Sequence, residues 1–326
     1  MNSEASFQSL HEEALKATDG FVYRRVLPLS SYDIRLEVGH VGGRHRIRVK
    51  GAHPAPSGKL KQTRSLSAAY DAADQSLKVE LLDVRLSTLF SALIDDFLSA
   101  LTALDGQVDA IQVLLDRMAL WSRLFEEAAF DGLTGEEQRG LFCELLMLKD
   151  LLLPALGSPV AVASWKAPAG NTKDFIHGLV AVEVKSRFRK GNTRIRISSE
   201  TQLECSAGDL FLAVYSLDTD GTSGQSLPAL VDALRVVVAD SGVALTRFDD
   251  LLIQAGYLDI HKTFYEEPHY VASLSLYSVH AGFPRILPTD LLAGVTHVSY
   301  DIELSNCAQF AVGSERLVTL VGGVVG

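Results

Sequence analysis

The sequence predicts an α/β protein, α+β overall, because segments with strand and helix periodicity both recur along its 326 residues. Residues 32–50 alternate apolar and charged side chains around Gly42-Gly43, which is typical of a β-hairpin. Residues 86–104 and 108–129 repeat apolar side chains about every 3.6 residues, as amphipathic helices do. Residues 210–217 form an apolar run of strand length. A chain of this length favours two or three folding units.

We predict three domains along the chain: residues 1–115, residues 116–225 and residues 226–326. The first is a small α+β domain. Its amphipathic helix within residues 1–20 precedes the hairpin, and a proline-containing loop at residues 51–58 precedes a strand at residues 78–85. The third is an α+β extension with these predicted elements: helices at residues 227–239 and 247–255, and strands at residues 270–280 and 295–304.

The second domain contains a long predicted helix that begins near Glu136, where acidic residues occupy the first turn, and ends near Pro154. Residues 158–173 are expected to be strand and loop. Ser199 and Gln202 have the spacing of a capping box, so a further helix is predicted to start at residues 198–202.

The composition excludes several classes of protein. A net charge of -10 and a pI near 5.4 argue against a protein that coats nucleic acid or an anionic membrane through bulk charge. Three widely spaced cysteines without a CxxC pair favour neither a disulfide framework nor a structural zinc site. The sequence contains no signal-peptide pattern and no run of about 18 apolar residues. We therefore expect a cytoplasmic protein that does not span a membrane.

The most specific chemical pattern is KDFIHGLVAVEVKS, which begins at Lys173. With His177-Gly178 as a two-residue turn, we expect an antiparallel hairpin in which Asp174 lies opposite Ala181. Alternation then gives two faces: Asp174, Ala181, Glu183 and Lys185 on one, and Val180, Val182 and Val184 on the other. In this register Glu183 is the diagonal neighbour of Asp174, roughly 7–8 Å away between backbones.

Two carboxylates at that separation suit a hard divalent cation such as Mg²⁺, or Mn²⁺, which takes oxygen ligands and keeps several waters. Lys185 can stabilise charge that develops on a phosphate and help to orient or deprotonate an attacking water. The pattern therefore indicates hydrolysis of phosphodiester bonds. The alternative is that Asp174 is a turn residue and that Glu183 and Lys185 form a solvated ion pair.

Glu144 and a basic run extend this pattern. Leucines bracket Glu144 on the predicted helix, where a carboxylate is costly unless it is paired or binds metal; the alternative is an exposed position at the flank of the helix. Residues 185–196 contain six Lys or Arg and no acidic residue. This run predicts either the solvated edge of a sheet or DNA-backbone contacts from these residues: Arg187, Arg189, Lys190, Arg194 and Arg196.

Glu144, Asp174 and the triplet Glu183-Val184-Lys185 resemble the PD-(D/E)xK nuclease superfamily. The chain is similar to the branch of PD-(D/E)xK motif proteins that accompanies restriction-modification and phage-defence genes. The similarity covers most of the chain, above all after residue 135, through these segments: GLFCEL around Glu144, Trp165 with Pro168, VEVKS, SSETQL, Gly256-Tyr257, FPRI and VSYDIEL. Lys173 stands where the motif would have proline, and Cys143 where this branch has a small glycine.

The resemblance implies a restriction-endonuclease-like core, in which helices flank a four-stranded mixed sheet, and metal-dependent cleavage of DNA. It implies the following roles: Asp174 and Glu183 as metal ligands, Glu144 as an auxiliary acidic residue at the metal, Lys185 as catalytic base or charge stabiliser, and Gln202 as a supporting polar residue. It also implies partners such as a DNA methyltransferase and ATPases. Cutting both strands with one site per chain favours a homodimer. The alternative is a nuclease-fold subunit that binds DNA or acts as a scaffold without cutting, and RNA or branched or single-stranded DNA stays open as the substrate.

Overall fold

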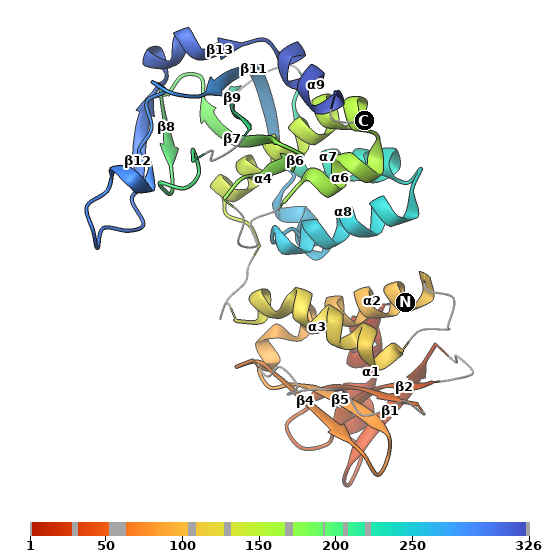
Figure 1. Ribbon diagram of the computed structural model, residues 1–326. Coiled ribbons are helices and arrows are strands. Elements are labelled where there is room, and N and C mark those ends of the chain that lie inside the picture. Colours follow the sequence, from red (N-terminus) through yellow and green to blue (C-terminus); the bar gives the residue numbers. More distant parts are fainter. Residues whose placement is uncertain are drawn as a thin grey trace. The chain divides into compact units, whose positions relative to one another are not determined.

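The computed structural model divides into two compact units, Met1–Phe130 and Asp131–Gly326. It describes residues 2–27, 32–51, 63–103, 109–126, 132–166, 172–191, 193–204, 208–218 and 223–323 (Figure 1). The division differs from the predicted boundaries near residues 115 and 225. Helix α3 (Ala110–Glu126) packs against α2 (Ser87–Ala103) in the first unit. Strand β11 (Pro268–Val279) pairs along β9 (Asp209–Asp218), so the third predicted segment shares a sheet with the second.

The first unit is built on a five-stranded antiparallel sheet in the order β1-β2-β3-β5-β4. Its strands are β1 (Phe21–Val26), β2 (Asp33–Gly39), β3 (His45–Lys50), β4 (Leu66–Asp71) and β5 (Ser76–Leu81). The predicted hairpin is confirmed, because β2 pairs with β3 from Asp33 opposite Lys50 to Val38 opposite His45. Both Gly42 and Gly43 take positive φ in its turn, as a tight hairpin requires. Strand β4 was not predicted, and the predicted loop at residues 51–58 lies almost wholly outside the described residues.

Helix α1 (Ser3–Ala14), α2 and α3 supply the helical part of this unit, and a 3-10 turn (Val84–Leu86) leads into α2. The apolar positions of β2 are fully buried, as are Phe7 and Leu10 of α1. Leu15, the residue after α1, is 72% exposed. The alternate positions of the strands carry ion pairs, including Arg46 with the buried Glu37 at 2.5 Å.

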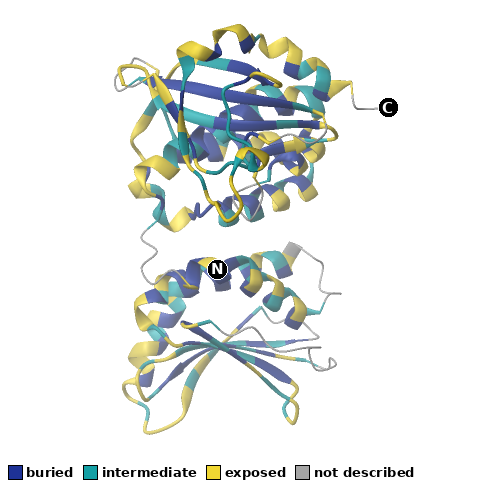
Figure 2. Ribbon diagram, turned by 60° about the vertical axis from the view of Figure 1, so that its left-hand side comes forward, coloured by how far each residue is buried: buried dark blue, intermediate teal, exposed yellow. Residues whose placement is uncertain are grey.

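The second unit is built on a mixed sheet flanked by helices, as predicted, but the sheet has six strands and not the four expected. The main path runs β10-β11-β9-β7-β6, and β13 (Ala311–Val312) pairs with β11. The remaining strands are β6 (Phe175–His177), β7 (Val180–Phe188) and β10 (Gln225–Ser226). Strands β7 and β9 are parallel, whereas β6 and β11 run antiparallel to their neighbours. Strand β9 is buried at all but its two ends, whereas β7 is buried mainly in its first half, where side chains cover both faces of the sheet (Figure 2).

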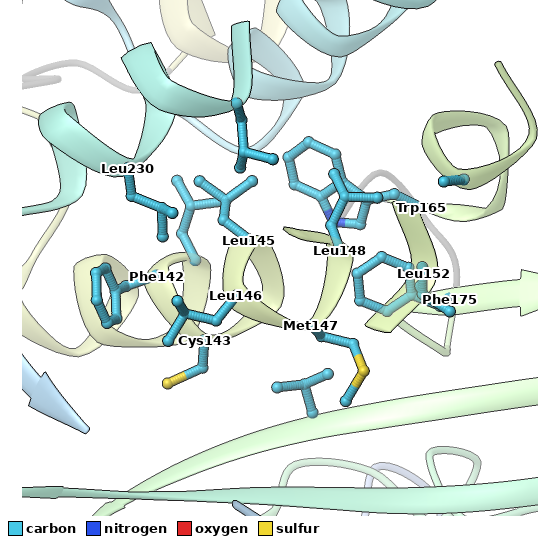
Figure 3. Close-up of a cluster of buried hydrophobic side chains, with 14 of the residues drawn as sticks. Phe142, Cys143, Leu145, Leu146, Met147, Leu148, Leu152, Trp165, Phe175 and Leu230 are labelled. Carbon is cyan, nitrogen blue, oxygen red and sulfur yellow. The ribbon is translucent and has the colours of Figure 1, made fainter. Parts of the chain in front are cut away.

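Helices cover one face of this sheet. They are α4 (Gly135–Met147), which continues as a π-helical turn (Leu148–Leu152) and α5 (Leu153–Leu156), then α6 (Ser158–Ser164), α7 (Leu227–Val238), α8 (Gly242–Gln254) and α9 (Ser314–Gly322). Thr134 and Glu137 form a capping box that starts α4. Leu145, Trp165 and Phe175 belong to the core between helices and sheet (Figure 3). The prediction of strand and loop at residues 158–173 was wrong for α6, because proline after Gly157 favours the first turn of a helix.

A two-stranded ribbon lies on the other face. Strand β8 (Arg194–Ile197) pairs with β12 (Tyr300–Glu303), and their apolar side chains join Leu210, Leu212 and Val214 of β9 in a second core. A 3-10 helix (Leu304–Phe310) completes this layer, and two more lie at Asp259–Phe264 and Pro288–Asp290. The strand predicted at residues 295–304 is therefore limited to its second half. None of the described helices is long and apolar enough to cross a membrane.

Candidate active site

The hairpin formed by β6 and β7 fixes the geometry of the candidate site. The sequence suggested a turn at His177-Gly178, but the structure turns at Gly178 and Leu179, and Phe175 lies opposite Val182. The predicted register was therefore wrong by two residues. Extending the observed register by one residue places Asp174 opposite Glu183, so the two carboxylates are direct neighbours and not diagonal ones. A shift of two residues keeps every side chain on the same face of the hairpin. Asp174, Glu183 and Lys185 therefore still share one face, as predicted.

Alternation along β7 separates the charged residues from the helical core. Val182 and Val184 pack into the core below the helices, whereas Ala181 packs against the second core on the ribbon side. Glu183 and Lys185 alternate with the valines and so project on the ribbon side of the sheet. Strand β6 begins at Phe175. The backbone N–H of Val184 donates a hydrogen bond to Oδ2 of Asp174, the residue before β6, at 2.6 Å.

Glu144 lies on α4 and supplies a third carboxylate near Asp174 and Glu183. Trp165, which follows α6, donates its indole N–H to Glu144 Oε2 at 2.8 Å. Trp165 is fully buried and also forms a bridge to Phe175, the residue after Asp174. Trp165 therefore connects the helix that carries Glu144, through its indole, to the strand beside Asp174, through its backbone.

Burial and mutual repulsion shape the electrostatics of the three carboxyls. Burial and the negative charge of Asp174 raise the pKa of Glu183 to about 8, although Lys185 opposes this shift. Burial raises the pKa of Glu144 well above its ordinary value, and the negative charges of Asp174 and Glu183 raise it further. Burial also raises the pKa of Asp174, opposed by Lys185 and by the Val184 N–H. The site thus holds more negative charge than it can stabilise without added protons or a cation.

Lys185 is the cation at the centre of this group. Its Nζ lies 2.7 Å from Glu183 Oε1, and its side chain is 17% exposed. Burial disfavours its charge, but the three carboxylates outweigh burial and raise the pKa of Lys185, with Glu183 as the strongest. Lys185 therefore stays protonated. It cannot act as a base until the negative charge of the carboxylates is neutralised.

The donor set fits a hard divalent cation. Glu183 is 1% exposed, and its Oε2 is buried without a hydrogen-bond partner among the described residues, which a native structure tolerates only for a reason. Within that part of the chain no group of three or more His, Cys, Asp or Glu side chains is arranged so that it could hold a metal ion, so at most two protein carboxylates are available as ligands. Mg²⁺ suits this arrangement, since it is usually held by one or two carboxylates together with waters and substrate phosphates. Asp174 and Glu183 would hold the ion, with Glu144 beside them.

Gln202 lies outside this group of contacts. Its segment is a turn and not the predicted start of a helix, and its side-chain oxygen accepts a hydrogen bond from the backbone N–H of Ser198 (2.8 Å). Ser199 accepts a hydrogen bond from Thr201 N in the same turn. The capping-box spacing thus encodes a local turn, because Ser and Gln side chains satisfy backbone groups in turns as well as in helices. A role for Gln202 in the site stays a prediction.

The basic run follows β7 and continues into β8. Its members are Arg187 on β7, Arg189 and Lys190 in the turn after it, and Arg194 and Arg196 on β8. Two of these arginines lie in ion pairs: Arg189 with Asp218 at 3.3 Å, and Arg194 with Glu303 at 3.0 Å. Acidic neighbours that are distant in sequence therefore offset part of the positive charge. Contacts from this run to DNA stay a prediction.

Two residues with a bearing on the site were not assigned roles from sequence. Lys173 is buried next to Asp174, and its charge lowers the pKa of both Asp174 and Glu183. Arg139 of α4 places its guanidinium 4.8 Å from the ring centre of Phe188, at the end of β7. The sequence offered one signal for each residue: Lys173 is adjacent to Asp174, and Arg139 lies five residues before Glu144 on the same helix.

The mixed sheet flanked by helices, with carboxylates and a lysine on a central strand, defines a nuclease-like fold. Residues 3–305 match a family model described as "Putative PD-(D/E)XK family member, (DUF4420)". The chain therefore belongs to this family. Searches of curated proteins and of solved structures found no match.

Proposed function

We propose that the protein is a divalent-metal-dependent endonuclease that hydrolyses phosphodiester bonds in DNA. The observation that carries the proposal is the gathering of three carboxyl groups beside Lys185, with Glu183 buried and Asp174 and Glu144 partly buried. Nothing in folding calls for three carboxylates there, since each one costs free energy when it is ionised and buried. Perturbed carboxyl groups of this kind are typical of sites selected for chemistry.

We assign the following roles to the residues of the site. Asp174 and Glu183 would hold Mg²⁺, or Mn²⁺, which would supply positive charge to polarise the scissile phosphate. Lys185, whose Nζ lies 2.7 Å from Glu183 Oε1, would turn its ammonium toward the phosphate oxygens. Glu144, which accepts the indole N–H of Trp165, would accept a proton from the attacking water. Arg187, Lys190 and the neighbouring arginines contact the DNA backbone.

A cleavage assay with matched controls tests this proposal. Duplex DNA is incubated with Mg²⁺ and either the wild-type protein, Asp174→Ala or Lys185→Ala, and each variant is expected to lose about 10²-fold or more in rate. Asp232→Ala and Lys262→Ala serve as controls, because these residues form an exposed ion pair in the same unit (3.0 Å) that lies outside the site. Equal cleavage by the wild type and both site variants would refute the assignment.

A second candidate is a subunit of the same fold that binds DNA or other subunits without cutting. Two observations favour it: Glu183 is already occupied by Lys185, and two arginines of the basic run are paired with acids. A Mn²⁺ titration separates the candidates, because a scaffold has no reason to bind the ion at Asp174 and Glu183. RNA and branched or single-stranded DNA are compared as substrates in the cleavage assay.

The biological setting belongs to the same proposal. We place the protein in the cytoplasm as a subunit of a restriction or phage-defence system, with a DNA methyltransferase and ATPases as partners and a homodimer as the form that cuts both strands. The proposal rests on the resemblance of the sequence to PD-(D/E)xK motif proteins that accompany restriction-modification and phage-defence genes. Co-purification with the products of neighbouring genes, with sizing of the complex, tests it.

A further inference from the structure

Within the described residues, helices cover only one face of the five-stranded sheet in the first unit (Figures 1 and 2). On that face Leu36 and Ile47 are fully buried. Alternation along the strands turns the charged side chains to the opposite face, which we call the open face. On the open face and its turns, seven basic side chains pair with five acidic ones. The surface therefore has an excess of positive charge, although the whole chain has a net charge of -10.

Two exposed aromatic rings on the edge strand β1 distinguish the open face from a surface that holds ion pairs alone. Phe21 is 38% exposed and Tyr23 is 55% exposed, and they lie two residues apart, so both rings share this face. The guanidinium of Arg35 lies 4.3 Å from the ring centre of Tyr23, and that of Arg46 lies 3.5 Å from the ring centre of Phe21. Each ring is thus held by a cation–π contact while much of its surface stays open to solvent.

Gly39 shows that the position of the Phe21 ring is built into the sheet. Gly39 of β2 lies opposite Phe21, and a Cβ atom there would lie 3.2 Å from the ring, tighter than ordinary van der Waals contact. Because that atom is absent, the ring can lie across β2 and reach Arg46 on β3. Glu37 pairs with the same arginine at 2.5 Å and fixes its guanidinium. The open face therefore presents aromatic rings and oriented guanidinium groups side by side.

We propose that the open face, with Phe21, Tyr23 and Arg25 at its edge, binds single-stranded nucleic acid. Surfaces that bind single strands combine aromatic rings, on which bases stack, with basic groups that follow the phosphates. Residues two apart on a strand are separated by about 7 Å, so the two rings can receive successive bases of an extended strand. A guanidinium has five N–H donors, so an arginine that pairs with one carboxylate keeps donors for a phosphate.

This inference is independent of the proposed metal-dependent function, because the open face belongs to the first unit and its chemistry needs no metal. A duplex keeps its bases stacked inside the helix, so the exposed rings favour a single strand. Failure of the nuclease site therefore leaves the inference standing, and failure of the inference leaves the nuclease site standing.

Fluorescence anisotropy of a labelled oligothymidylate, with the full chain and an excess of EDTA, tests the proposal. Tyr23→Leu should weaken binding about tenfold, because the ring that stacks on a base is lost. Tyr23→Phe keeps the ring and should bind as the wild type does. Phe264→Leu is the control for loss of an exposed aromatic ring, since Phe264 is 66% exposed in the second unit, and its binding should be unchanged.

Arg24 and Arg25 provide a matched control for charge, because neighbours on β1 point to opposite faces. Arg24 Nη2 donates to Ser9 Oγ (3.1 Å) and Glu13 Oε1 (3.2 Å) of α1, whereas Arg25 pairs with Asp33 at 2.8 Å on the open face. Arg25→Gln should reduce the slope of log K against log salt by about 0.7, the share of one phosphate contact on a single strand. Arg24→Gln should leave the slope unchanged.

Competing ligands identify the occupant. The oligothymidylate should bind more tightly than a duplex of the same length, and polyglutamate should not displace it. Unchanged binding by Tyr23→Leu, or equal salt slopes for Arg24→Gln and Arg25→Gln, overturns the inference. Displacement by polyglutamate also overturns it and identifies an acidic protein segment as the occupant. Urea unfolding identifies any variant that fails to fold, and if Tyr23→Leu does so, the comparison of Arg24→Gln with Arg25→Gln decides.

Discussion

The raised pKa of Glu183 predicts how the stability of the metal-free protein depends on pH. An ordinary glutamate titrates at 4.5, whereas Glu183 titrates at about 8 in the folded protein. The folded state therefore binds this proton more tightly than the unfolded state does. The penalty for ionising Glu183 is absent below pH 4.5, grows as the pH rises, and is complete above pH 8. At about 1.36 kcal/mol per pH unit, the free energy of unfolding falls by up to about 5 kcal/mol over this window.

Replacing Glu183 by Gln removes this titration and keeps the shape of the side chain. We expect the variant to match the wild type near pH 5, where Glu183 is protonated, and to be several kcal/mol more stable near pH 9. The two tryptophans allow the second unit to be followed by itself. In a Trp121→Phe background, the remaining Trp165 reports only on the unit that holds the site.

Urea unfolding of both proteins at intervals from pH 5 to pH 9, with a chelator present, measures the effect. Saturating Mn²⁺ should reverse the slope for the wild type, because metal binds the ionised carboxylates and its affinity rises with pH. Identical pH slopes for the wild type and Glu183→Gln, or wild-type stability that rises from pH 5 to pH 8, would contradict the electrostatic account.

Three further predictions concern other parts of the molecule. Trp165→Phe removes the donor to Glu144, and Mn²⁺ affinity measured by titration should fall about tenfold, whereas an unchanged affinity would show that the bond is irrelevant to the site. Lys190→Gln should reduce the slope of log K for DNA against log salt by about 1 in fluorescence anisotropy, and an unchanged slope removes Lys190 from the interface. Glu37→Gln leaves Arg46 without its charged partner and should destabilise the first unit by about 3 kcal/mol, measured by urea unfolding. DNA cleavage should be unchanged, and loss of cleavage would mean that the two units act together.

The alternation of residue types along the sequence was enough to predict which side chains share a face. It was not enough to predict which residues of β6 and β7 pair. The alternation of VAVEVK places Glu183 and Lys185 opposite the valines in any register. The turn residues decide which residues pair, and Gly178 was assigned to the wrong position of the turn. A shift by two residues leaves the pattern unchanged, so the sequence alone could not choose between direct and diagonal neighbours.

The errors elsewhere arise from contacts that are distant in sequence. The acidic partners of Arg189 and Arg194 come from β9 and β12, and no local pattern in the basic run indicates them. The segment around Gln202 is held as a turn by Ser198 and by Arg285, which lies 82 residues beyond Leu203. The carboxylates of the site could be selected from sequence because burial of charge needs an explanation wherever it occurs.

Crystals soaked in Mn²⁺ test the central claim most directly, because the anomalous scattering of the ion locates it without reference to activity. We predict one peak between the carboxylates of Asp174 and Glu183, near Glu144, with Lys185 moved away from the 2.7 Å contact with Glu183. Asp174→Ala crystals should lack this peak. A wild-type map with no manganese at these carboxylates, and with Lys185 still paired to Glu183, would contradict a metal-dependent nuclease site.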